Sequence, residues 1–142
     1  MGISNQTLKT AVAAFMGGFP GRDFAEFTEP YANLVPGLTL WGWGDREFVP
    51  PVDALSVRVN LLPAAKTVLV ANSRAAGVLT FEVWAPVGSE DDADTLAAAL
   101  ETACLSAPRI GPILVQSATA MNGEHVDGLW RATVRVGWVV YG

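Results

Sequence analysis

Alternation of apolar and polar residues in the segment 128–141 constrains the fold more than any other feature of the sequence. One set of alternate side chains is apolar throughout, and the opposite set is polar from position 131 to position 135. The apolar set is Trp130, Ala132, Val134, Val136, Trp138 and Val140, and the opposite set includes Arg131, Thr133 and Arg135. A period of two is typical of a β-strand with one face on a core and the other in solvent. We therefore expect a sheet that is covered on one side only.

Other segments carry strand signals of the same kind. Residues 54–61 and 77–84 alternate in the same way, and residues 67–71 form a short apolar run. Residues 113–121 come shortly before the C-terminal strand. We expect these two strands to form a β-hairpin, with Asn122-Gly123 as a turn signal.

Two segments have helical periodicity. Residues 4–16 place their apolar side chains on one face, with Ser4 as the capping residue and Gly17 at the end. A second, alanine-rich helix of about three turns follows residue 92, and its apolar face ends at Cys104. Four carboxylates at its start complement the helix dipole. They are Glu90, Asp91, Asp92 and Asp94.

These elements predict one α+β domain over residues 1–142, with a mostly antiparallel β-sheet and two helices packed on one face. The N-terminal helix ends at residue 16, and the sheet-plus-helix core occupies residues 54–142. Residues 17–53, rich in glycine, proline and aromatic side chains, form a long irregular region with one short strand at 38–43. A connection this long in a compact domain is usually functional or forms an interface.

The composition indicates a subunit rather than an isolated protein. Charged residues make up 16% of the 142-residue chain and hydrophobic residues 51%, whereas charged residues make up about 25% of a typical soluble domain. A folded chain of this size exposes roughly 7,000 Å² of surface, so we expect part of an apolar surface to be buried against other subunits. No apolar run is long enough to span a membrane. A formal net charge of −5 argues against a protein that grips nucleic-acid phosphates.

The sequence offers little for catalysis or metal binding. A single cysteine and a single histidine exclude an intrachain disulfide and a Cys/His metal cluster. We interpret Cys104 as a core residue and His125 as an exposed residue in a hairpin loop. The acidic residues at 90–94 lack the spacing of a calcium loop, and we interpret them as the solvated start of a helix. We therefore expect no catalytic residue, no metal and no cofactor.

Trp41 and Trp43 are the most conspicuous aromatic pair. Residues two apart in a strand point to the same side, so their rings are expected to lie together. Three interpretations are open for the pair: part of the core, an anchor at a protein interface, or a stacking platform for a small ligand.

Three segments carry a family resemblance. The first is Glu-Phe-Val-Pro-Pro at 47–51 followed by Leu-Ser-Val-Arg-Val-Asn-Leu-Leu-Pro-Ala at 55–64. The second is Gly-Val-Leu-Thr-Phe-Glu-Val-Trp-Ala-Pro-Val-Gly at 77–88, just before the alanine-rich helix, and the third is Trp-Arg-Ala-Thr-Val-Arg-Val at 130–136. In this order and spacing, residues 47–141 resemble the tail terminator (tail completion) proteins of long-tailed bacteriophages. Residues 17–46 depart from the family by being longer.

The resemblance implies a structural virion protein without catalytic activity. Such proteins form a homo-hexameric ring on the last ring of the tail tube protein, end tube polymerisation, and present a surface to the head–tail connector or stopper protein. The same fold serves gene transfer agents. The implied location is the tail or neck of the virion, after assembly in the host cytoplasm. DNA would pass through the lumen without specific binding, which an acidic chain favours.

Two alternatives remain: another neck, connector or minor tail protein of the same particle, or a soluble small-ligand-binding α+β domain that uses Trp41 and Trp43. For the ring, we expect contacts from the irregular region and from an arm at residues 63–76. The expected contact residues are the apolar anchors Trp41, Trp43 and Phe48, the arm residues Leu69 and Val70, and the polar rim residues Arg46 and Arg74.

Overall fold

The fold is seen in a computed structural model, which describes residues 5–26, 38–44, 48–61, 65–68, 73–106 and 109–141. Its helices are α1 (Asn5–Gly17) and α2 (Glu90–Ser106). Its strands are β1 (Asp23–Glu26), β2 (Leu38–Trp43), β3 (Ser56–Leu61), β4 (Ala65–Val68), β5 (Ser73–Ala85), β6 (Arg109–Ile110), β7 (Ile113–Ala120), β8 (Glu124–Val126) and β9 (Leu129–Tyr141).

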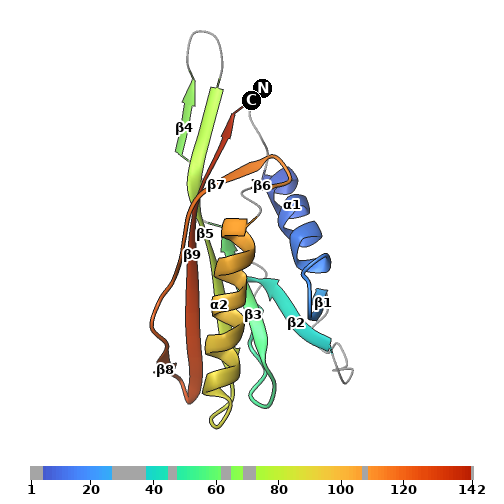
Figure 1. Cartoon of the computed structure of the whole chain (residues 1–142), viewed down its shortest axis with the longest axis vertical. Coiled ribbons are helices and arrows are strands. Elements are labelled where there is room, and N and C mark those ends of the chain that lie inside the picture. The colour runs from blue at the N-terminus through green and yellow to red at the C-terminus, as the bar shows by residue number, and fades with distance from the viewer. Residues whose placement is uncertain are drawn as a thin grey trace.

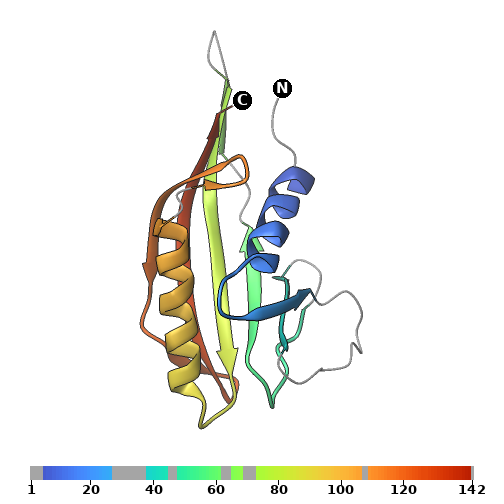
Figure 2. The same cartoon turned by 45° about the vertical axis from the view of Figure 1, so that its right-hand side comes forward.

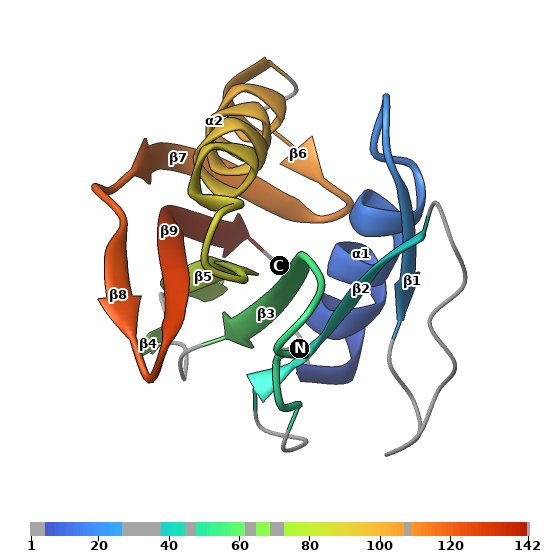
Figure 3. The same cartoon turned by 90° about the horizontal axis from the view of Figure 1, so that it is seen from below.

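The strands form one curled sheet in the order β1-β2-β3-β5-β9-β7-β6, with β4 paired to β5 and β8 paired to β9 (Figures 1 and 3). Every pairing is antiparallel except β1 with β2 and β2 with β3, which are parallel. The predicted fold class, α+β with a mostly antiparallel sheet, is confirmed.

The long strands β5 and β9 form the centre of the sheet, in a register that runs from Arg74↔Tyr141 to Ala85↔Trp130. The predicted alternation is confirmed here, because the apolar set on each strand is buried. It consists of Leu79, Phe81 and Val83 on β5, and Ala132, Val134, Val136, Trp138 and Val140 on β9. Above the body of the molecule, β4 pairs with the first residues of β5 and forms a projecting arm (Figure 1).

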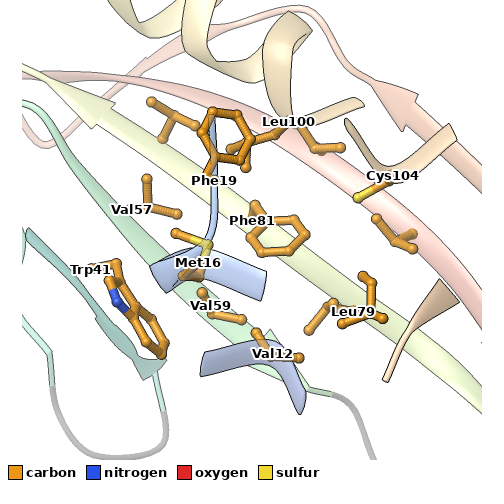
Figure 4. Close-up of a cluster of buried hydrophobic side chains, with 14 of the residues drawn as sticks. Val12, Met16, Phe19, Trp41, Val57, Val59, Leu79, Phe81, Leu100 and Cys104 are labelled. Carbon is orange, nitrogen blue, oxygen red and sulfur yellow. The ribbon is translucent and has the colours of Figure 1, made fainter. Parts of the chain in front are cut away.

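Both helices lie on the same side of the curled sheet and enclose the core (Figures 2 and 4). The buried side of α2 consists of Ala93, Leu96, Ala97, Leu100 and Cys104. From α1, Val12 and Met16 reach the same cluster as Phe81 of the central strand. Cys104 is fully buried, as predicted, and this burial raises the pKa of its thiol to about 11.

A bulge in β7 keeps its apolar residues on the covered face. The register with β9 shifts between Val115 and Ser117. Before the shift the core receives Ile113 and Val115, and after it the partly buried residues are Ala118 and Ala120. One extra residue therefore changes the inward positions from odd to even numbers.

The structure corrects several element boundaries. The region at 17–53, expected to be irregular apart from one strand, contains β1 as well as β2, and both pair in parallel. The second helix is longer than expected, with 17 residues. The predicted hairpin of residues 113–121 with 128–141 is present as β7 paired with β9, with a connection longer than two residues, but Asn122-Gly123 lies in the link from β7 to β8 and not at a tight turn. The tight turn instead joins β8 to β9 at Asp127 (φ 51°) and Gly128 (φ 80°), because both central residues of a type I′ turn need positive φ. The predicted cap Ser4 lies outside the described residues.

Candidate interaction surface

The side of the sheet opposite the helices is an open face, formed by the outward side chains of β3, β5, β7 and β9. Both described helices lie on the other side of the sheet (Figure 3). The open face is nevertheless partly covered, because Ser56, Trp84 and Val139 are buried and Gly44 lies against the side chains of Asn60 and Arg58. Its cross-strand rows join Ser56, Trp84 and Arg131, then Arg58, Glu82 and Thr133, then Asn60, Thr80, Arg135 and Thr119. The alternation that fills the core therefore also places three arginines on one open surface.

At one end of the open face, two arginines share a single indole ring. The guanidinium carbons of Arg58 and Arg131 lie 5.3 and 5.6 Å from the ring centroid of Trp84, within cation–π range. Glu82 accepts a hydrogen bond from Arg58 Nε at 2.6 Å and one from the indole N–H of Trp84 at 3.3 Å. Arg131 also pairs with Glu124 of β8. We call Arg58, Glu82, Trp84 and Arg131 the arginine–tryptophan cluster.

The cluster keeps positive charge at the surface. The side chains of Arg58 and Arg131 are 30% and 28% exposed, whereas that of Glu82 is 14% exposed. Arg135 lies further along the same face, is exposed, and forms no ion pair within the described part of the chain. The open face therefore carries three arginines against the carboxylates of Glu82 and Glu124, of which Glu124 is 60% exposed, and Arg135 supplies the positive charge that is not paired among the described residues.

The opposite side of the sheet carries the acidic start of α2 at the same end of the molecule. Asp94 accepts a hydrogen bond from the indole N–H of Trp130 at 2.9 Å. Backbone hydrogen bonds at Glu90 itself and at Gly88 lower the pKa of the Glu90 carboxyl. Asp91 and Asp92 are exposed. The prediction that these carboxylates form the solvated start of a helix is confirmed.

A groove of about 430 Å³ runs between the end of α1 and the outer side of α2. Its lining is mostly apolar and consists of Phe19, Pro20, Ala98, Ala99, Thr102, Ala103 and Ser106. Apart from this groove, the apolar side chains Val49 and Val52 are 78% and 76% exposed, on either side of Pro50-Pro51.

The predicted aromatic anchors lie inside the chain. Trp41, Trp43 and Phe48 are 2%, 3% and 3% exposed. The rings of Trp41 and Trp43 meet edge to face with centroids 5.5 Å apart, so they do share a side of β2, and that side is the core. Phe48 packs over Gly42, where a Cβ would come within 2.5 Å of its ring. Side chains buried this deeply leave no surface for a partner or a stacking ligand, so the expected anchor role is corrected to a core role.

The structure does not test the other four predicted contact residues. Arg46, Leu69 and Val70 lie outside the described residues, and only the backbone of Arg74 is placed, opposite Tyr141. The sequence pattern does not predict the arginine–tryptophan cluster, although its residues occupy the polar positions of the alternating strands. A period of two marks those positions as solvent-facing and does not show which of them meet.

His125 is exposed as predicted, although it lies in β8 rather than in a loop, and its ring is 4.9 Å from that of Trp130. Within the described ranges, no group of three metal-ligating side chains comes together. None of the helices there is long and apolar enough to cross a membrane.

Comparison with known proteins places the fold but not a family. No family model and no curated protein matches the sequence. Among solved structures, one chain known only by a sequence identifier matches with a TM-score of 0.62 and 20% identity, over 98% of this chain and 96% of its own length. A chain from the virion of a native gene transfer agent particle matches with a TM-score of 0.48 and 19% identity, over 67% of this chain and 76% of that chain. The first likeness shows that the whole fold occurs in another protein.

Proposed function

We propose that this chain is a structural virion protein that forms a hexameric ring on the tail tube, ends tube polymerisation and joins the tail to the head–tail connector. The observation that carries the proposal is the two-sided sheet. One side is covered by the two helices, and the other carries three arginines in its outward rows, while an arm projects from one end of the sheet (Figure 1). A ring subunit needs two unlike lateral surfaces, because each copy contacts its neighbours in a head-to-tail manner.

The sequence resemblance supports the same role. Its three segments fall on β3 and residues before it, on β5 with the turn before α2, and on β9. These strands are neighbours at the centre of the sheet. The resemblance therefore covers one contiguous structural unit rather than scattered pieces.

The proposal includes an absence of catalytic activity and a lumen that DNA crosses without specific binding. A formal net charge of −5 supports the second point, because phosphate repulsion opposes retention of DNA. The small-ligand alternative is less well supported, since the tryptophan pair that it requires is part of the core.

Native mass spectrometry of the purified chain, alone and after incubation with tail tubes, tests the proposal. We expect hexamers of the 15.0 kDa chain, either free or on tube ends, where electron microscopy would show a terminal ring. Deletion of the gene should give overlong or unjoined tails. A chain that stays monomeric with and without tubes, and whose deletion leaves tail length and joining unchanged, would overturn the proposal.

A further inference from the structure

The open face and the acidic start of α2 carry opposite charge and lie on different sides of the molecule, so the open face of one copy can contact the helix of another. We propose that the open face of one copy binds the exposed side of α2 of a second copy. In this contact the arginine–tryptophan cluster and Arg135 lie opposite the acidic start of that helix. The inference rests on the proposed ring and specifies its lateral contact.

Charge complementarity selects a second copy as the occupant of the open face. Asp91 and Asp92 are exposed and take part in no ion pair among the described residues, and the same holds for Arg135. Glu90 and Asp94 add to the negative charge of the same helix turn. Opposite charges on two surfaces of one chain attract a neighbouring copy and oppose contacts between like surfaces.

The surfaces also allow close approach. Along α2, the exposed stripe above the carboxylates continues through Thr95, Ala98, Ala99 and Thr102. These positions follow helical spacing, so they line one side of the helix. On the open face, the rows beyond the cluster carry Thr80, Ser117 and Gly137. Small side chains on both surfaces let a helix lie close to a sheet.

The arginine–tryptophan cluster and the acidic start of α2 lie at the same position along the long axis of the molecule, because both contact neighbouring residues of β9. Trp130 and Arg131 are adjacent, so their side chains point to opposite sides of the sheet. Trp130 binds Asp94 of the acidic patch, and Arg131 belongs to the arginine–tryptophan cluster. In a view along the long axis, α2 and the open face lie on different sides of the molecule (Figure 3). If the two surfaces meet at the same position along the long axis, neighbouring copies are related by a rotation with little translation along that axis. Such a relation closes a ring rather than extending a filament.

A mixing experiment with two charge variants tests the contact. The face variant is Arg135→Glu, and the helix variant is Asp91→Lys/Asp92→Lys. All three residues are exposed, so folding should be retained, which circular dichroism and urea unfolding check. In low salt, we expect each variant to need an at least about tenfold higher concentration for half-assembly than the wild type. A mixture of the two should restore assembly towards that of the wild type. The intact face of one variant meets the intact helix of the other, and the two reversed surfaces again carry opposite charge.

The controls are Asp23→Lys and Arg109→Glu, which change net charge at exposed positions on the two edge strands, β1 and β6. They should assemble as the wild type does. Unchanged assembly of both charge variants, or effects equal to those of the controls, would overturn this contact while leaving the ring proposal intact. A wild type that stays monomeric with and without tubes would overturn the ring as well as the contact.

Discussion

At the scale of single residues, Gly42 is packed so closely against Phe48 that no larger side chain fits. A Cβ at this position would lie 2.5 Å from the Phe48 ring, closer than packed atoms allow. We predict that Gly42→Ala lowers the free energy of unfolding by about 1–3 kcal/mol, the usual cost of overpacking. Urea denaturation measures this effect.

The matched control is Gly17→Ala at the end of α1. A Cβ there meets nothing within 4 Å, so the unfolding free energy should stay the same or rise by up to about 1 kcal/mol. Equal effects of the two substitutions would contradict the close packing of Phe48 on β2.

Cys104 makes stability sensitive to alkaline pH. Burial raises the pKa of its thiol from 9.0, the value that the unfolded chain keeps, to about 11. Between these values only the unfolded chain has released the proton, so stability is complete below the lower value and falls as pH rises. From pH 8 to 11 we predict that the wild type loses about 2 kcal/mol more than Cys104→Ala.

Urea unfolding at several pH values, with a reductant present, measures the difference. The cavity left by Cys104→Ala gives a constant offset that does not depend on pH. Parallel pH profiles for the two proteins would show that the thiol ionises equally in the folded and unfolded states.

Residue spacing predicted which side chains share a face, but not what covers that face. Period two correctly placed Trp41 and Trp43 together. Their burial depends on the curl of the sheet and on its contact with α1, which arise from residues far away in the sequence. The local sequence pattern therefore could not predict whether the side chains of the expected contact site are exposed or buried.

At the scale of whole elements, α2 protects an edge of the sheet. Beyond its short pairing with β6, the outer edge of β7 has no partner strand among the described residues. Glu101 of α2 accepts a hydrogen bond from the backbone N–H of Ala120 on β7. Covering an edge in this way hinders strand pairing with other chains.

We predict that Glu101→Ala lowers the free energy of unfolding by about 1–2 kcal/mol, because a partly buried N–H loses its acceptor. Glu101→Gln keeps an amide oxygen at the same position and should recover most of that loss. Urea denaturation measures stability, and light scattering reports aggregation through the open edge. A loss as large in Glu101→Gln as in Glu101→Ala would show that the acceptor is unimportant.

Elements with long, regular patterns were predicted well, and short ones were not. The alternation in β3, β5 and β9 and the spacing in α2 identified each of them. Strand β1 has four residues, too few for a period to be distinct, and its parallel pairing joins segments that no tight turn connects. Asn122-Gly123 and Asp127-Gly128 are both good turn dipeptides, and strand pairing alone decided between them.

At the scale of the whole molecule, Val49 and Val52 test whether the segment between β2 and β3 takes part in assembly. Because they are 78% and 76% exposed, Val49→Ser/Val52→Ser should change the unfolding free energy by less than about 1 kcal/mol. If this segment contributes to ring contacts, the concentration for half-assembly should rise severalfold, as measured by analytical ultracentrifugation.

The control for this pair is Met121→Ser, which removes another exposed apolar side chain, 53% exposed, from the link between β7 and β8. It should leave assembly unchanged. If the double variant assembles as readily as the wild type, the segment around Pro50-Pro51 lies outside the contact.

The position of β9 has a consequence for how the protein is made. Although β9 comes last among the strands, it lies between β5 and β7 and carries a large part of the core. On the ribosome, the earlier strands emerge with the central place in the sheet still empty. The apolar surfaces of α2 and β5 therefore stay exposed until β9 has left the ribosomal exit tunnel. Folding of this domain is therefore completed only after β9 has emerged, and chaperones that shield nascent chains should bind it until then.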